Sequence, residues 1–242
     1  MPAHERSGID LLTPEARTLV DELLAAPGQG RAVAFDADGT LWRGDVGEEL
    51  MRYLAAEDHL PRYRGRRGVY AEYERRVKED PADAYAFAVE VMEDLAEREL
   101  EALCAEFFRR RFEGRVFPYA RLLLSALDQA GYALWVVSAS PLWPVVAGAV
   151  SLGVPARNVI GVECLRSGGR LTRDVLRPVP CGEGKVAWLE KNGVRPVLAV
   201  GNGDLDLPML AWSERALVVA PPGEDNGLVR EARERGWPIQ RC

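Results

Sequence analysis

One short segment constrains the fold of this chain more than any other. Arg31 to Phe35 is an apolar run typical of a strand buried on both faces, and the Asp-Ala-Asp-Gly sequence at 36–39 ends it as a loop. The same pattern, an apolar run that stops at polar residues, glycine or proline, recurs further along the chain. These later strands are predicted at 132–137, 195–200 and 216–219.

Helical patterns separate these strands. They cover 119–130, 184–192 and 205–212, and another helix is predicted at 10–26, ahead of the first strand. Strand–helix alternation predicts an α/β fold: a Rossmann-like parallel sheet with right-handed crossovers and helices on both faces. In such sheets the functional site lies at the carboxyl ends of the strands, where the polar clusters of this chain also fall.

The region from about 45 to 116 has a different character. It is charged and helical in pattern, it is rich in Tyr, Arg and Glu, and it has few β-branched runs. We therefore predict a helical cap at 45–116, inserted after the first strand of a core formed by 1–44 and 117–242. Residues 159–177 are predicted to form a β-hairpin that turns at Ser167-Gly168-Gly169.

Composition narrows the class of protein. The net charge of −6 argues against a nucleic-acid partner. There is no run of about 18 apolar residues, so no membrane span is expected. The opening MPAHERSGIDLL lacks the basic and apolar regions of a secretion signal. Four scattered cysteines without a Cys-x-x-Cys pair disfavour structural zinc and a disulfide framework, so we expect a reducing, cytoplasmic location.

The segment AFDADGTLW at 34–42 carries the strongest chemical signal. Asp36 and Asp38 are two positions apart just past a buried strand, so both carboxylates point to roughly the same side. Gly39-Thr40 then lets the chain turn tightly. Asp-Gly is also a common surface turn, but a buried strand leading into Asp-x-Asp-Gly-Thr is much rarer.

DADGT resembles the first motif of the haloacid dehalogenase superfamily, Asp-x-Asp-x-Thr. The three other motifs follow in the expected order. Ser138 at the end of LWVVSAS resembles the second, Lys185 in GEGKVAWL the third, and GNGDLDLPML at 201–210 the fourth. The resemblance extends from about residue 31 to 220 and is greatest to the phosphoserine-phosphatase-like branch, in which a helical cap follows the first motif.

The resemblance implies a phosphatase that works in two steps. Asp36 would attack the phosphoryl group and form an aspartyl-phosphate. Asp38 would protonate the leaving oxygen and then activate water. The implied phosphate-binding groups are Thr40, Ser138, Ala139 and Lys185.

The resemblance also implies Mg²⁺ as cofactor, because a carboxylate and a phosphate repel unless a hard cation bridges them. Asp36, the backbone carbonyl of Asp38 and the fourth motif would hold it. Phosphoserine phosphatases carry Asp directly after the first Gly of that motif, whereas this chain has Asn202, which offers an oxygen without the charge. Asp206 matches the second acid of the motif, and Asp204 is an additional candidate.

Substrate choice is expected to come from the cap. Asp45 matches the acidic position that binds the substrate amino group in phosphoserine phosphatases, and Glu48 lies close by. Trp42 would add a cation–π contact. The cluster suits a small substrate with an amine or quaternary ammonium, such as phosphoserine, phosphocholine or phosphoethanolamine. The alternative is that Asp45 merely begins a cap helix, where an acid favours the helix dipole.

Other functions remain open. A phosphomutase or other phosphotransferase keeps both acids, so only phosphate release distinguishes a phosphatase from it. A non-catalytic phospholigand-binding protein often lacks the nucleophile, whereas Asp36 and the other motif residues are present here. A dehalogenase does not need the second acid and a phosphate-pumping ATPase has Thr in its place, so Asp38 argues against both. The expected partner is a small phosphorylated metabolite, and the sequence predicts no oligomeric state.

Overall fold

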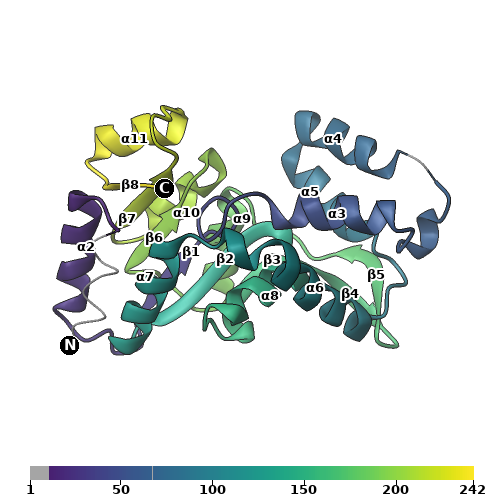
Figure 1. Cartoon of the computed structure of the whole chain (residues 1–242), viewed down its shortest axis with the longest axis horizontal. Coiled ribbons are helices and arrows are strands. Elements are labelled where there is room, and N and C mark those ends of the chain that lie inside the picture. The colour runs from purple at the N-terminus through teal and green to yellow at the C-terminus, as the bar shows by residue number, and fades with distance from the viewer. Residues whose placement is uncertain (1–10, 67) are drawn as a thin grey trace.

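A six-stranded, fully parallel sheet forms the centre of the protein (Figure 1). The computed structural model describes residues 11–66 and 68–242. The strand order is β3–β2–β1–β6–β7–β8, so β1 lies between β2 and β6. This confirms the predicted parallel sheet. The strands are β1 (Ala32–Phe35), β2 (Ala133–Pro141), β3 (Val159–Val162), β6 (Leu198–Gly201), β7 (Ala216–Ala220) and β8 (Ile239–Arg241).

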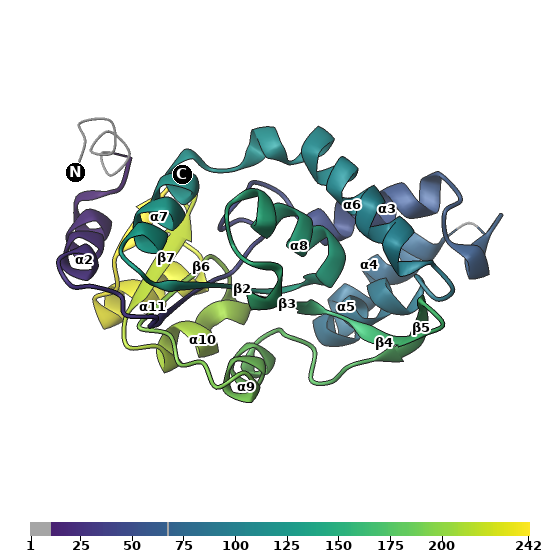
Figure 2. The same ribbon diagram turned by 90° about the horizontal axis from the view of Figure 1, so that it is seen from below.

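Helices cover both faces of the sheet, as predicted. Val33 and Phe35 belong to one apolar core and Ala34 to another, because successive side chains of a strand point to opposite faces. Figure 2 shows α9 and α10 on one side of the sheet and α7 on the other. One face is covered by α2 (Pro14–Leu24), α7 (Pro118–Gln129) and α8 (Leu142–Ser151), the other by α9 (Glu183–Lys191), α10 (Leu207–Trp212) and α11 (Gly227–Arg235).

Among the described residues, four helices and two short 3-10 turns lie between β1 and α7, and they belong to the part of the molecule beside the sheet on the right of Figure 1. They fill the region at 45–116 that the sequence predicts to be helical. The division of the whole chain into a core domain and a cap domain stays a prediction. The elements are α3 (Val46–Ala56), η1 (Pro61–Tyr63), α4 (Val69–Glu79), α5 (Pro81–Glu90), α6 (Glu97–Arg111) and η2 (Glu113–Arg115).

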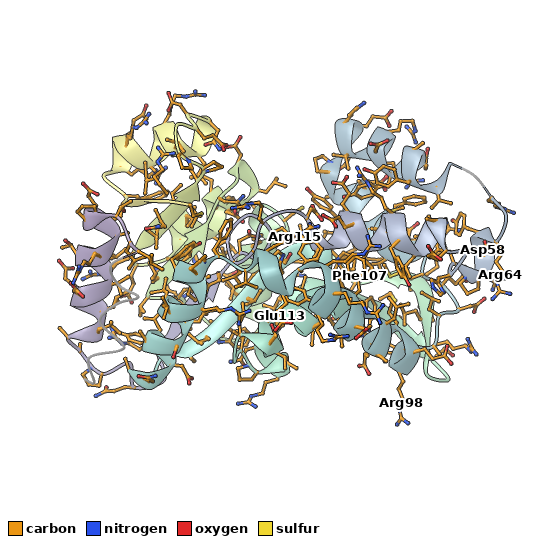
Figure 3. The ribbon with its side chains drawn as sticks, in the orientation of Figure 1. Asp58, Arg64, Arg98, Phe107, Glu113 and Arg115 are labelled. Carbon is orange, nitrogen blue, oxygen red and sulfur yellow. The ribbon has the colours of Figure 1, made fainter. Side chains whose placement is uncertain are left out.

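The connections into and out of this helical region run side by side. The Arg43 N–H donates to the Arg115 carbonyl at 3.0 Å, and the Phe117 N–H donates to the Leu41 carbonyl at 3.0 Å. The Arg115 guanidinium also pairs with Glu49 on α3. Figure 3 shows Arg115 where the helical region meets the sheet. These contacts fix α3 relative to the loop after β1.

The hairpin predicted at 159–177 is partly wrong. Its first four residues are β3, which is buried and pairs with β2 at the edge of the main sheet. The observed hairpin consists of β4 (Cys164–Ser167) and β5 (Arg170–Val175), and backbone hydrogen bonds of Leu171 join it to the turn before α6. The apolar sequence VIGV of β3 is typical of a buried parallel strand. Because β4 follows it almost directly, the two strands were predicted as one arm of a single hairpin.

Several element boundaries also differ from the predictions. β2 continues to Pro141, so Ser138 lies within the strand and not at its end. The strand predicted at 195–200 spans 198–201, and the helix predicted at 205–212 starts as the 3-10 turn η4 (Asp204–Asp206). The first ten residues lie outside the described part of the chain, and they include the start of the helix predicted at 10–26 and most of the opening MPAHERSGIDLL segment. Within the described part, no helix is long and apolar enough to cross a membrane.

Candidate active site

The carboxyl ends of β1, β2 and β6 meet at a cavity of about 280 Å³. Phe35 pairs with Val136 on one side and with Val200 on the other, so the next residue, Asp36, lies between the two neighbouring strands. Every predicted catalytic, phosphate-binding and metal-binding residue lines this cavity except Thr40. Thr40 is fully buried and donates a hydrogen bond to Asp36 Oδ2 at 2.9 Å.

A buried ionic cluster lies at the floor of the cavity. The Lys185 ammonium donates to Asp36 Oδ1 at 2.7 Å, to Asp206 Oδ1 at 2.6 Å and to the Val137 carbonyl at 2.8 Å. Lys185 is 1% exposed, Asp36 7% and Asp206 3%. All three ammonium hydrogens are therefore used, and a positive charge is fixed against the predicted nucleophile.

Burial and charge shift the pKa values of this cluster. Burial raises the pKa of Asp36 to about 6, and the neighbouring Asp206 adds to the rise while Lys185 opposes it. Burial alone lowers the pKa of Lys185, but the two carboxylates outweigh burial and the net shift is upward. At neutral pH the lysine is therefore charged and Asp36 is mostly ionised, as a nucleophile requires.

Close packing explains why the third motif contains glycine. Lys185 lies in the first turn of α9, where the chain turns tightly against the segment before it. A Cβ at Gly184 would lie 1.9 Å from the Val179 carbonyl oxygen. Any larger residue there would push the helix start, and the lysine with it, away from Asp36.

Three oxygen-bearing groups fit a magnesium site. With its amide nitrogen turned toward them, Asn202 donates to the Asp38 carbonyl oxygen and to Asp36 Oδ2, both at 3.1 Å. The Asn202 amide thus faces the two other predicted ligands, and to hold Mg²⁺, which prefers hard oxygens, it would turn its carbonyl oxygen toward them in place of the nitrogen. No group of three or more His, Cys, Asp or Glu side chains among the described residues has the arrangement of a metal site, so the set relies on one carboxylate, one carbonyl and one amide.

Asp206 faces a different set of partners. Its Oδ1 accepts from Lys185, and its Oδ2 accepts from the backbone N–H groups of Asn202 at 2.9 Å and Gly203 at 3.0 Å. The carboxylate therefore holds Lys185 and the loop after β6, and its role as a metal ligand stays a prediction. The additional candidate, Asp204, is exposed at the cavity wall.

The carboxyl group of Asp38 is held by three donors. Its Oδ1 accepts from Trp42 Nε1 and from the Val46 N–H, both at 2.7 Å, and its Oδ2 accepts from Ser140 Oγ at 2.6 Å. Burial raises the pKa of Asp38 well above its ordinary value, and the charge of Asp45 adds to the rise. A carboxyl that keeps its proton to higher pH is suited to act as a general acid.

The predicted phosphate contacts of the second motif lie on β2. Ser138 is 1% exposed, and its Oγ accepts from the Ser140 N–H at 3.1 Å. Ala139 follows it along the cavity wall. α8 begins at Leu142, close to the predicted helix start at Pro141.

The structure contradicts one of the predicted specificity contacts. Trp42 is fully buried, and its ring packs edge-on against Phe108 with centroids 5.0 Å apart, so a substrate cannot stack on it. Glu48 lies outside the main cavity but lines an adjoining one together with Asp45, and it pairs with Arg52 at 2.6 Å, so its part in specificity stays a prediction. Asp45 does line the cavity, and it also caps α3 by accepting from the Glu48 N–H at 2.7 Å.

A comparison with models of known protein families shows which family the chain belongs to. The haloacid dehalogenase-like hydrolase family model matches residues 33–211, which include all four motifs. The chain is a haloacid dehalogenase-like hydrolase. The predicted superfamily, and the prediction that the chain is one of its enzymes, are confirmed.

Relatives of this hydrolase place it near the phosphoserine phosphatases. It is 29% identical to phosphoserine phosphatase SerB1 of Mycobacterium tuberculosis, over 86% of this chain and 70% of that protein. It is 25% identical to a histidinol-phosphatase of Neisseria meningitidis, over 85% of this chain and 96% of that protein. A solved protein of unknown function from Bordetella pertussis shares the fold with a TM-score of 0.74 and 21% identity, over 87% of this chain and 98% of that chain.

Sequence reasoning missed the side chains of Ser140 and Tyr85, which line the hydrolase site. Ser140 lies two residues after Ser138 in the same strand, so both side chains point to one face, and that spacing was a usable signal. Tyr85 reaches the cavity from α5. No local pattern marks Tyr85, because its position depends on how the helical region packs beside the sheet.

Proposed function

We propose that this hydrolase is a magnesium-dependent phosphomonoesterase that acts on a small phosphorylated metabolite through an aspartyl-phosphate on Asp36. One observation carries the proposal: the buried Asp36 carboxylate contacts the Lys185 ammonium, and a second, proton-retaining carboxyl, Asp38, lines the same cavity. A nucleophile, a fixed positive charge and a general acid are the groups that phosphoryl transfer through a covalent intermediate requires.

In the first step, an Asp36 oxygen attacks phosphorus and the bond between phosphorus and the leaving oxygen breaks. Asp38 donates its proton to that oxygen, so the product leaves as a neutral alcohol. In the second step, Asp38 takes a proton from water, which attacks the aspartyl-phosphate and releases inorganic phosphate. Asp36 is regenerated as a carboxylate and Asp38 as an acid.

Phosphate binding in this proposal uses groups of the chain on several elements. Lys185 supplies a positive charge, while Ser138, Ala139 and Thr40 supply hydroxyl or backbone groups at or beside the cavity. When bound, Mg²⁺ would neutralise charge between Asp36 and the phosphoryl group, held by Asp36, the Asp38 carbonyl and Asn202, with Asp206 beside them.

The relatives support a small, nitrogen-bearing substrate. One is named for phosphoserine and another for histidinol phosphate, and both compounds carry an amine on the leaving alcohol. Phosphoserine, phosphoethanolamine and phosphocholine are therefore the first substrates to test. The net charge of −6 supports a metabolite rather than a nucleic acid as partner, and a cytoplasmic location is part of the proposal.

The test measures inorganic phosphate released from a panel of phosphomonoesters with Mg²⁺ and with a chelator. Asp36→Asn should lower turnover by several orders of magnitude and abolish acid-stable labelling of the protein by phosphate, while the melting temperature stays close to that of the native chain. Full activity in Asp36→Asn would refute the aspartyl-phosphate mechanism. Transfer of phosphate to a second alcohol without release would instead identify a phosphotransferase.

A further inference from the structure

Trp42 does not line the active-site cavity, yet its indole contacts the proposed general acid. The Trp42 Nε1–H donates to Asp38 Oδ1 at 2.7 Å, and the side chain is fully buried. The backbone N–H of Val46, at the start of α3, donates to the same oxygen at 2.7 Å. An N–H group can only donate, and two such donors occupy both lone pairs of a carboxyl oxygen. Oδ1 is therefore fixed as an acceptor, because a proton on it would displace one of these two bonds.

The other oxygen of the Asp38 carboxyl group has a different environment. Oδ2 accepts from Ser140 Oγ at 2.6 Å, and Ser140 lines the cavity, whereas Trp42 and Val46 do not. One lone pair of Oδ2 remains free to carry a proton, and the Ser140 hydroxyl can rotate to suit either protonation state. The carboxyl group is thus turned so that Oδ1 faces the protein interior and Oδ2 lies on the cavity side.

Close packing between two helices holds the indole in place. Phe108 of α6 meets the Trp42 ring edge-on, with centroids 5.0 Å apart. Gly148 of α8 lies against both rings, since a Cβ at this glycine would lie 2.7 Å from Trp42 Cη2 and 2.5 Å from Phe108 Cε2. Glycine inside a helix is less favourable than alanine, so a packing requirement explains it here. The absence of a side chain at Gly148 leaves the space that the indole needs to reach Asp38.

We infer that Trp42 is a positioning residue for Asp38: its indole holds Oδ1 in place, so that Oδ2 delivers the proton to the leaving oxygen. In that step the Oδ2–H bond breaks as a bond forms between the hydrogen and the leaving oxygen, and the electron pair stays on Asp38 as a carboxylate. In the second step the same oxygen takes a proton from the attacking water. Gly148 and Phe108 act through Trp42. The inference rests on the proposed phosphomonoesterase activity and adds the residues that orient its general acid.

The experiment measures kcat/KM with Mg²⁺ for phosphomonoesters whose leaving groups range from para-nitrophenol to simple alkyl alcohols. Trp42→Phe keeps a buried ring but removes the N–H, and it should lower kcat/KM for alkyl phosphates by roughly tenfold or more. Para-nitrophenyl phosphate should lose less than about threefold, because its leaving group needs little protonation. Inhibition by inorganic phosphate should not change. Trp143→Phe on α8 is the matched control, since that buried indole donates to Glu97 at 3.2 Å and its loss should not alter the dependence on the leaving group.

A second variant keeps the test decisive if Trp42→Phe folds poorly. Gly148→Ala retains the indole N–H but pushes the ring away from Asp38, so it should cause the same selective loss on alkyl phosphates. Gly114→Ala is its control, because a Cβ there meets nothing within 4 Å. A loss that is equal on all leaving groups, or alkyl phosphate rates that match the native enzyme, would overturn the inference alone. Failure of the native enzyme to hydrolyse any phosphomonoester, para-nitrophenyl phosphate included, would overturn the proposed function and the inference with it.

Discussion

Lys185 donates a 2.7 Å hydrogen bond to Asp36, and this buried ion pair joins α9 to the end of β1. Because the same ammonium also pairs with Asp206, its removal leaves two carboxylates uncompensated in the protein interior. Lys185→Met should therefore lower the free energy of unfolding by roughly 3–5 kcal/mol and abolish phosphatase activity.

Denaturant unfolding measures the effect of Lys185→Met. The matched control is Lys191→Met on the same helix, where the lysine is exposed over the Trp188 ring and its loss should change stability little. Equal stability of the two variants would mean that the buried pair contributes nothing to the fold.

Asp206→Ala should be far more damaging than Asp204→Ala. Asp206 is buried and holds both Lys185 and two backbone N–H groups, whereas Asp204 is exposed at the cavity wall. Loss of charged hydrogen bonds of this kind costs roughly 1.5–3 kcal/mol each. Thermal melts and steady-state rates should both show the difference, and a larger loss of activity in Asp204→Ala would assign the fourth-motif role to Asp204 instead.

Asn202→Asp should tighten Mg²⁺ binding by at least about tenfold, because a charged oxygen replaces a neutral one beside Asp36. Without metal, the new carboxylate repels Asp36 and loses the hydrogen bonds that the amide donates. The melting temperature of this variant should therefore fall in chelator and rise in Mg²⁺ by more than that of the native chain. Isothermal titration and paired melts measure both effects, with Asn192→Asp, an exposed site, as control. An unchanged Mg²⁺ affinity would argue against Asn202 as a ligand.

Activity should fall as the pH drops through about 6, because burial raises the pKa of Asp36 to about 6 and only its ionised form is nucleophilic. A cation bound beside Asp36 stabilises the ionised form, so the acid limb of the rate profile should move to lower pH as Mg²⁺ increases. Initial rates at several Mg²⁺ concentrations test this. An acid limb that does not respond to Mg²⁺ would mean that the titrating group lies away from the metal.

Ser140→Ala should slow hydrolysis of alkyl phosphates by roughly tenfold and affect para-nitrophenyl phosphate much less. Ser140 donates to Asp38 at 2.6 Å and helps to orient its carboxyl group. Poor leaving groups depend most on protonation by Asp38, so they should be the most sensitive. Ser151→Ala on α8 is the control, since that hydroxyl bonds only within its own helix. An equal loss across leaving groups would indicate a structural role for Ser140.

The sequence alone was sufficient to predict four of the six strands of the sheet, β1, β2, β6 and β7, and the residues that follow them. Each of these four is an apolar run that ends in polar residues, glycine or proline, and this pattern is local information. β8 was not predicted, because its sequence Ile-Gln-Arg is not an apolar run. Because parallel strands end at one edge, Asp36 and Asn202 were expected near one site, whereas Lys185, 149 positions from Asp36, was assigned to that site from its resemblance to the third motif. β3 was misread because a buried edge strand and a hairpin arm have similar short apolar patterns.

Only the tertiary structure decided which side chains reach the substrate space. Trp42 lies next to the first motif, yet α6 packs against α8 and buries its ring against Phe108. Tyr73 and Tyr85 come from helices with no catalytic pattern, yet both line a cavity beside Asp45. The periodicity of apolar residues indicates which face of a helix is apolar. It does not indicate which element covers that face or what cavity is left between the two, because both depend on contacts between residues far apart in the chain.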